Sequence, residues 1–266
     1  LCEKPMATTE VDCRAMIATC AERDVRLMIA YRLHFTDAHL RAIELAKSGK
    51  LGELRYFHSL FAMQVKDENI RVRREMGGGT LYDIGIYCIN AARCLFRAEP
   101  LRVSAICLRD GFSVSVSLEF PEGRVAQFTC SFAAASTEDF RIVGTKGDLT
   151  LEEAYPFVGE KRLRITVGGK TQVRKFKGGD QFGPLIDYFS DCIVRNREPG
   201  PSALEGLADI RIIEAVYRSI ELGRVVELSL PEELPSRPDL SLEKRRPAVR
   251  KPELIHAEEP SKKDAA

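Results

Sequence analysis

The sequence predicts two architectures in succession. The first is the C-terminal end of a doubly wound α/β domain, and the second is an α+β domain with a mostly antiparallel, open-faced sheet and helices on one face. Three observations predict this fold class. Residues 1–50 alternate helical and strand patterns, residues 101–176 hold short strand-like segments between turn dipeptides, and residues 181–222 are largely helical in pattern.

The first 50 residues contain an apolar strand pattern between two helices. In Thr8–Arg23, apolar residues recur near helical spacing, and Thr8 or Thr9 is suited to cap the helix. Val25–Tyr31 is an almost uninterrupted apolar run, which is typical of a strand buried on both faces. Thr36–Lys50 predicts a second helix. Such a segment is the end of a doubly wound domain rather than a unit that folds alone.

The second architecture begins with a strand and a helix. Leu54–Met63 is strand-like, and Gly77–Phe96 contains a helix that begins near Thr80 or Leu81. Seven short strand segments follow: RVSAICL, FSVSVSLEF, RVAQFTCSF, FRIVG, DLTLE, RLRITV and TQVRKF. In the second of them apolar residues alternate with serine and glutamate, as in a sheet with one covered face. Two helices and a last short strand complete the pattern: Gln181–Val194, Ala203–Leu222 and Val225–Leu230.

The composition excludes several classes of protein. With 44% hydrophobic residues and a net charge of +1, the chain can form a sizeable core and has no charge excess that would favour nucleic acid or an anionic membrane as a partner. No apolar stretch approaches the ~20 residues that span a bilayer. The eight cysteines form no C-x-x-C pair, and the four histidines lack metal-ligand spacing. We therefore expect no metal site, reduced thiols and a cytoplasmic protein.

Asp83 and Tyr87 are the first candidate catalytic pair. They lie four residues apart on a predicted helix, so their side chains share one face, and a hydroxyl acid/base beside a carboxylate suits removal of a proton from a sugar hydroxyl. In the alternative interpretation Thr80 and Asp83 form a helix capping box, and Tyr87 is a half-buried aromatic residue. The glycines at 77–79 either let the backbone approach a ligand or form a flexible loop.

Three basic residues are further candidates. Lys4, followed by Pro5, places a cation at a strand end, where open α/β sheets bind ligands, although a terminal lysine is most often an ordinary surface residue. Arg32 ends the buried strand pattern and either forms a salt bridge or contacts phosphate or sugar. Arg71 lies in a basic stretch, 69–74, just before the glycines; most such stretches are solvated. The chain contains no G-x-G-x-x-G motif.

Four ordered blocks resemble one enzyme family: Glu3-Lys4-Pro5, Tyr31-Arg32-x-His34-Phe35, Gly77–Tyr87 and Gln181–Leu222. Together they are similar to the Gfo/Idh/MocA-type oxidoreductases. The nearest branch is that of glucose–fructose oxidoreductase, because Tyr87 stands where inositol-dehydrogenase-like members carry histidine. In this family the tripeptide follows the fifth strand of a dinucleotide-binding domain. The resemblance thus implies that most of that Rossmann domain, roughly 100 residues, lies upstream of Leu1.

The resemblance also implies a reaction and its residues. The substrate would be an aldose or related polyol, and the cofactor NADP or NAD, with NADP the more frequent in this branch. Lys4 would contact the nicotinamide ribose and the reacting hydroxyl, Asp83 would hold the sugar, and Tyr87 would accept the hydroxyl proton. A free tyrosine ionises near pH ~10, so this role requires a nearby cation, for which Lys4 is the candidate. The cofactor side would be lined by Glu3, Lys4, Arg32 and Arg71.

These implications divide the chain into three parts: the end of the dinucleotide-binding domain (1–35), an α+β substrate and oligomerisation domain (36–230), and a tail rich in proline and charge (231–266). We expect a homodimer or tetramer formed through the open sheet face. We also expect that this chain alone does not bind NAD(P). Two alternatives remain open: a truncated, non-catalytic oligomerisation or binding module, and, among enzymes, a dihydrodiol dehydrogenase.

Overall fold

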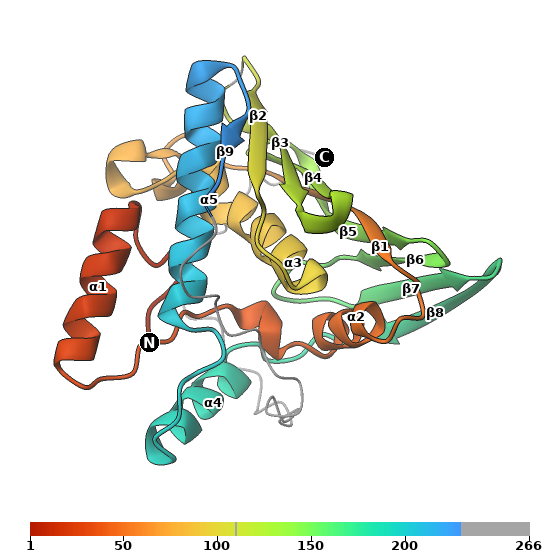
Figure 1. The fold of residues 1–266 in the computed structure, drawn as a ribbon, viewed down its shortest axis with the longest axis horizontal. Coiled ribbons are helices and arrows are strands. Elements are labelled where there is room, and N and C mark those ends of the chain that lie inside the picture. Colours follow the sequence, from red (N-terminus) through yellow and green to blue (C-terminus); the bar gives the residue numbers. More distant parts are fainter. Residues whose placement is uncertain (110, 230–266) are drawn as a thin grey trace.

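A computed structural model describes residues 1–109 and 111–229 (Figure 1). In these residues one sheet of nine strands has the order β8-β7-β6-β5-β1-β4-β3-β2-β9. The strands are β1 Leu54–Gln64, β2 Arg102–Cys107, β3 Ser113–Phe120, β4 Arg124–Ser131, β5 Ala133–Gly144, β6 Gly147–Glu152, β7 Lys161–Val167, β8 Lys170–Phe176 and β9 Val226–Glu227. The α-helices are α1 Glu10–Glu22, α2 Asp37–Lys47, α3 Ile86–Phe96, α4 Gly183–Val194 and α5 Ala203–Leu222.

The sheet is mixed, as β1 runs parallel to β4 and every other neighbouring pair is antiparallel. The alternation in the sequence places side chains on the expected faces. In β3, which lies between β2 and β4 in the sheet, Val116 and Leu118 are buried while Ser115 is exposed. In β1, Phe57 and Phe61 point into the core. The predicted antiparallel, open-faced sheet is therefore confirmed, with one parallel pair that the sequence did not reveal.

Helices α3 and α5 lie across the buried face of the sheet (Figure 1). The side chain of Ser202 caps α5 by accepting from the amide of Glu205, and Gly223 ends the helix with a left-handed φ of +60°. Helix α1 is held to α5 because the Glu214 carboxylate accepts from the amide of Glu10 at 2.8 Å. The segment 1–35 thus packs on α5, and its assignment to a separate domain stays a prediction.

A buried ionic cluster joins α3 to α5. The guanidinium of Arg93 is fully buried and forms ion pairs with Glu99, Glu205 and Asp209. Asp209 also accepts from the hydroxyl of Tyr31 at 2.5 Å. Because three carboxylates surround one buried cation, this cluster fixes how the two helices meet the N-terminal segment.

The predicted strand Val25–Tyr31 is not a strand. It forms two isolated bridges, Cys2 with Ile29 and Met28 with Ser202, and Val25 is 52% exposed. The described residues form only single-residue bridges with this segment, so no sheet forms around it. Its buried apolar residues pack against helices instead. The continuation 32–35 is also not extended. It forms a 3-10 helix, so Arg32 does not end an extended strand as the sequence predicted.

The other helices and strands agree with the sequence patterns to within a few residues at each end, except that β5 begins at Ala133, well before the predicted segment that starts at Phe140. The helix predicted to begin near Thr80 or Leu81 does begin there, with a π-helical turn at Leu81–Gly85 before α3. The tail 231–266 lies outside the described residues. No helix among the residues described is long and apolar enough to cross a membrane.

Candidate functional site

The ammonium of Lys4 is brought to the first turn before α3, about 80 residues further along the chain. Its Nζ donates to the backbone carbonyl of Asp83 at 2.5 Å and to its carboxylate oxygen Oδ1 at 3.0 Å. The same Nζ lies 4.8 Å from the centroid of the Tyr87 ring. The Lys4 side chain is only 11% exposed, so Lys4 is a buried, positioned cation rather than an ordinary surface lysine.

Asp83 bridges two cations. While Oδ1 accepts from Lys4, Oδ2 accepts from Nε of Arg71 at 2.7 Å. The hydroxyl of Thr80 donates instead to the carbonyl of Phe112 at 2.8 Å. The carboxylate of Asp83 is thus used for charge pairing, and the capping-box interpretation is not what the structure shows.

The glycines before the π turn fold the chain that carries Arg71. The amide of Gly79 donates to the carbonyl of Arg71 at 2.8 Å. A Cβ on Gly78 would lie 2.6–2.7 Å from the carbonyl oxygens of Ile70, Arg71 and Arg73. Gly78 therefore allows a close approach of the protein's own backbone rather than of a ligand. This packing sets the position from which Arg71 reaches Asp83.

Tyr87 lies in the first turn of α3 and is 8% exposed. Its ring packs among aromatic neighbours, with ring centroids 5.8 Å from Phe61 and 6.0 Å from Tyr155. Its hydroxyl accepts from Nε of Arg32 at 3.2 Å. Tyr87 therefore has Lys4 over its ring and a guanidinium at its hydroxyl.

Arg32 is held in place by neutral groups. It is 3% exposed, donates to the backbone carbonyl of Tyr155 at 2.7 Å and to the side-chain oxygen of Gln181, and lies 4.0 Å from the ring centroid of Phe157. Gln181 in turn donates to the carbonyl of Phe157 at 3.1 Å. The 3-10 turn at 32–35 points the guanidinium inward, although the sequence predicted an extended strand here.

Five of the six candidate residues thus gather in one cluster: Lys4, Arg32, Arg71, Asp83 and Tyr87. Glu3 is exposed and takes no part in the cluster's described contacts. The sequence interpretation missed Tyr155 and Gln181 as residues that hold Arg32. Gln181 begins the fourth block of the family resemblance, and this position could have indicated a role in the site. Tyr155 lies between strands, and no sequence pattern marks it as a site residue.

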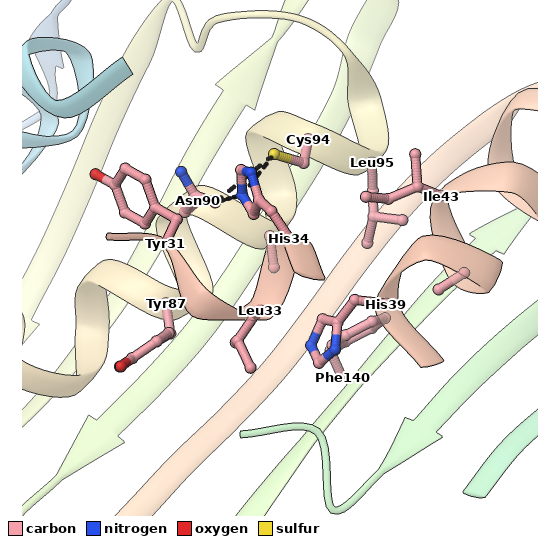
Figure 2. A pocket seen from close by; sticks show the side chains of 12 residues that line it. Tyr31, Leu33, His34, His39, Ile43, Tyr87, Asn90, Cys94, Leu95 and Phe140 are labelled. Atoms are coloured by element: carbon pink, nitrogen blue, oxygen red, sulfur yellow. Dashed lines mark hydrogen bonds between the residues drawn. The ribbon is translucent and has the colours of Figure 1, made fainter. Parts of the chain in front are cut away.

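A cavity of about 30 Å³ lies behind the Tyr87 ring (Figure 2). The Tyr87 hydroxyl points away from His34 and Cys94 in this view. Nδ1 of His34 and Nε2 of His39 are buried without a hydrogen-bond partner in the described residues. Burial, together with the charges of Lys161 and Arg32, holds the pKa of His39 well below its usual range, so His39 is neutral. No group of three or more His, Cys, Asp or Glu in the described chain could hold a metal ion.

Comparison with known proteins places the chain in a family of oxidoreductases. Residues 39–150 match the family model of the GFO/IDH/MocA C-terminal domain. A D-xylose 1-dehydrogenase [NADP(+)] of Haloarcula marismortui is 31% identical, covering 86% of this chain and 67% of that protein. A trans-1,2-dihydrobenzene-1,2-diol dehydrogenase of Danio rerio is 33% identical over 56% of this chain and 46% of that protein.

A solved structure gives the same result. The aldose-aldose oxidoreductase from Caulobacter crescentus, complexed with glycerol, is 36% identical and superposes with a TM-score of 0.81, covering 85% of this chain and 71% of that one. The chain belongs to the GFO/IDH/MocA family. The branch resemblance noted in the sequence is consistent with these relatives.

Proposed function

We propose that this protein is an NAD(P)-dependent oxidoreductase that acts on a hydroxyl of a sugar or polyol. The observation that carries the proposal is the position of Tyr87. It is 8% exposed, with Lys4 over its ring and Arg32 at its hydroxyl. A tyrosine that exchanges a proton near neutral pH needs such cations. The named relatives at 31% and 36% identity, one of them NADP-dependent by name, support the substrate class and the choice of NADP over NAD.

In this reaction a hydride leaves the carbon and a proton leaves its hydroxyl. The nicotinamide ring, when bound, accepts the hydride. The ionised Tyr87 oxygen would take the proton, and the Arg32 guanidinium, which only donates, lies at 3.2 Å from that oxygen. Lys4 lies over the Tyr87 ring, and Asp83 fixes its ammonium through both its carbonyl and its carboxylate. Arg71 donates to the second carboxylate oxygen of Asp83, so the negative charge of Asp83 is shared between Lys4 and Arg71.

The chain's residues fit one end of the cofactor. Lys4 and Arg32 lie at Tyr87, and Arg71 pairs with Asp83, so hydrogen-bond donors and positive charge would be available to the ribose hydroxyls and phosphates of a bound cofactor. The sequence holds no G-x-G-x-x-G, so we assign no residue to the pyrophosphate. We propose NADP or NAD contact by Lys4, Arg32 and Arg71; exposed Glu3 stays a prediction from the resemblance.

The test is Tyr87→Phe in the protein with a complete dinucleotide-binding domain, assayed with NADP+ and aldoses such as D-xylose. Turnover should fall at least ~100-fold with cofactor affinity little changed, since a general acid/base is lost. Tyr82→Phe is the matched control, because Tyr82 lies in the π-helical turn just before α3 and its hydroxyl donates to the carbonyl of Thr8. Near-normal turnover of Tyr87→Phe would reject the acid/base role of Tyr87, whereas a wild-type protein that turns over no aldose would favour the non-catalytic binding module.

A dihydrodiol dehydrogenase is the second candidate. Two partly exposed aromatic rings, Phe157 and Phe182, stack with centroids 5.9 Å apart, and Phe157 also lies against Arg32. Rings in this position suit a substrate with an aromatic or flat face. A panel that compares aldoses with aromatic dihydrodiols separates the two enzymes.

We also propose that the open sheet face joins two copies of the chain. Tyr56 on β1 and Ile106 on β2 are 60% and 66% exposed, and β1 and β2 belong to the same sheet. Exposed apolar side chains of this size favour an interface. The oligomeric state in solution tests this.

A further inference from the structure

The cation that contacts the Tyr87 hydroxyl is not the one that the sequence indicated. Lys4 directs its hydrogen bonds to Asp83 and lies over the face of the Tyr87 ring, 4.8 Å from its centroid. Arg32 donates from Nε to the hydroxyl oxygen itself at 3.2 Å. We propose that Arg32, rather than Lys4, is the main cation that stabilises the ionised hydroxyl of Tyr87, which makes Arg32 a positioning residue for proton transfer. This inference rests on the proposed function of Tyr87.

The charge of Arg32 is available to Tyr87 because its other contacts are neutral. Its remaining hydrogen bonds go to the Tyr155 carbonyl and the Gln181 amide oxygen, and its plane lies against the Phe157 ring. An arginine is always protonated in proteins, and at 3% exposure its field is weakly screened. A negative charge on the Tyr87 oxygen would therefore be the natural partner of this guanidinium.

Other buried tyrosines show what burial does without such a cation at the hydroxyl. Burial raises the pKa of Tyr31 and of Tyr155 well above the usual range. The hydroxyl of Tyr155 is paired with the Ser59 hydroxyl at 2.6 Å, and that of Tyr31 with the Asp209 carboxylate. Tyr87 is nearly as buried, yet its hydroxyl partner is a cation. At the hydroxyl itself, the contact with Arg32 distinguishes Tyr87 from these two buried tyrosines.

Several charged groups surround this contact and have to be separated in a test. Lys4 and Asp83 lie on the ring side of Tyr87, with Arg71 behind Asp83. On the other side, burial and then the charge of Arg32 lower the pKa of Lys161 to about 8. Burial raises the pKa of Glu138, while Lys161 and Arg32 lower it. Lys161 donates to the carbonyls of Glu153 and Pro156.

Lys161 therefore provides a matched control. It is a buried cation, 5% exposed, close enough to interact with Arg32, but its hydrogen bonds go to loop carbonyls rather than to Tyr87. If a general positive potential were sufficient, removing Lys161 or Arg32 would affect Tyr87 alike. If the contact at the hydroxyl matters, only the Arg32 variants will have a large effect.

The experiment is a pH titration of this chain labelled with ¹³C at Cζ of tyrosine, which reports phenol ionisation without cofactor or turnover. The chain has seven tyrosines and no tryptophan, and Tyr87→Phe assigns the Tyr87 signal. Relative to wild type, Arg32→Met should move the ionisation of Tyr87 to higher pH by ~1–3 units, the usual effect of losing an opposite charge at this distance. Lys161→Met should move it much less.

Arg32→Gln is the second variant, because it keeps a donor at this position and removes the charge. It should shift the Tyr87 ionisation in the same direction, and unchanged signals of Tyr56 and Tyr217, which have no described contact with Arg32, report that the fold is intact. An unchanged Tyr87 titration in both Arg32 variants overturns the proposal, as does an equal shift in Lys161→Met. The proposed enzymatic function fails on a different result, the absence of NADP+-dependent turnover of any aldose by the wild-type protein, so the two failures are distinguishable.

Discussion

Replacing Arg93 with methionine should destabilise the protein by about 3–5 kcal/mol at pH 8, the usual loss when one partner of a buried ion pair is removed. The Arg93 side chain is fully buried. It donates to both carboxylate oxygens of Glu99, at 2.7 and 3.0 Å, and to those of Glu205, at 3.3 Å, and it also pairs with Asp209. Methionine fills most of the volume but leaves these carboxylates without their cation.

The size of this effect is large compared with the stability of a domain. A total free energy of unfolding is about 5–15 kcal/mol, so the loss is a substantial fraction of it. For a chain of this length each kcal/mol lowers the Tm by roughly 2–4 °C, which gives a decrease of about 6–20 °C. A variant that retains the wild-type Tm would refute the argument that Arg93 compensates the three carboxylates.

The effect of the variant should also depend on pH in a defined direction. Burial raises the pKa of Asp209 to about 6, while the charge of Arg93 acts to lower it. Without Arg93 the buried carboxyls bind protons more tightly in the folded state than in the unfolded state. Stability contributed in this way is present at low pH and is lost as the pH rises through the folded-state pKa. The difference from wild type should therefore be smaller at pH 5 than at pH 8.

Urea denaturation followed by circular dichroism at both pH values measures the difference. Arg102→Met is the matched control, because Arg102 pairs with Glu119 at 3.0 Å while both side chains are nearly half exposed. That exposed pair should contribute at most ~1 kcal/mol. A loss in Arg93→Met as small as the loss in Arg102→Met, or one that is the same at pH 5 and pH 8, would show that the cluster is not held by charge compensation.

Two further predictions concern the site. Asp83→Asn should raise the KM for the sugar clearly and change the Tm little. The carboxylate that orders Lys4 and Arg71 is lost, but the Asp83 backbone carbonyl still holds Lys4. An effect confined to the Tm would instead indicate a structural carboxylate. The 266-residue chain alone should not bind NADPH at micromolar concentration, since its sequence holds no pyrophosphate-binding glycine motif. Saturable micromolar binding in a fluorescence titration would contradict this.

Local patterns were sufficient to predict most of the second architecture. The alternation along β3 and the turn dipeptides between strands are short-range features, and the structure confirms them. The apolar run Val25–Tyr31 misled because burial by helices and burial in a sheet select the same residue types. The pairing of β1 with β4 depends on contacts far apart in the sequence, which no local pattern encodes.

The candidate site shows the same division between what the sequence predicts and what only the three-dimensional structure shows. Lys4, Asp83 and Tyr87 were found through the family resemblance, and the structure brings them together. The partner of the Tyr87 hydroxyl could not be found, because Arg32 was expected to end an extended strand and instead begins a 3-10 turn. An available signal for the ionic cluster was overlooked: Arg93 stands within an otherwise apolar helix, where a charge requires buried partners.

The central position of β1 in the sheet has a consequence for how the chain folds. Strands β2 to β4 and strands β5 to β8 form two meanders of neighbouring hairpins, each from residues close in sequence. Only β1, which is synthesised before both, joins the two meanders, between β4 and β5 (Figure 1). Until it inserts, each meander has an unpaired edge that can pair with another chain. Insertion of β1 is therefore the non-local, slow step that makes the sheet continuous, and the step at which aggregation competes with folding.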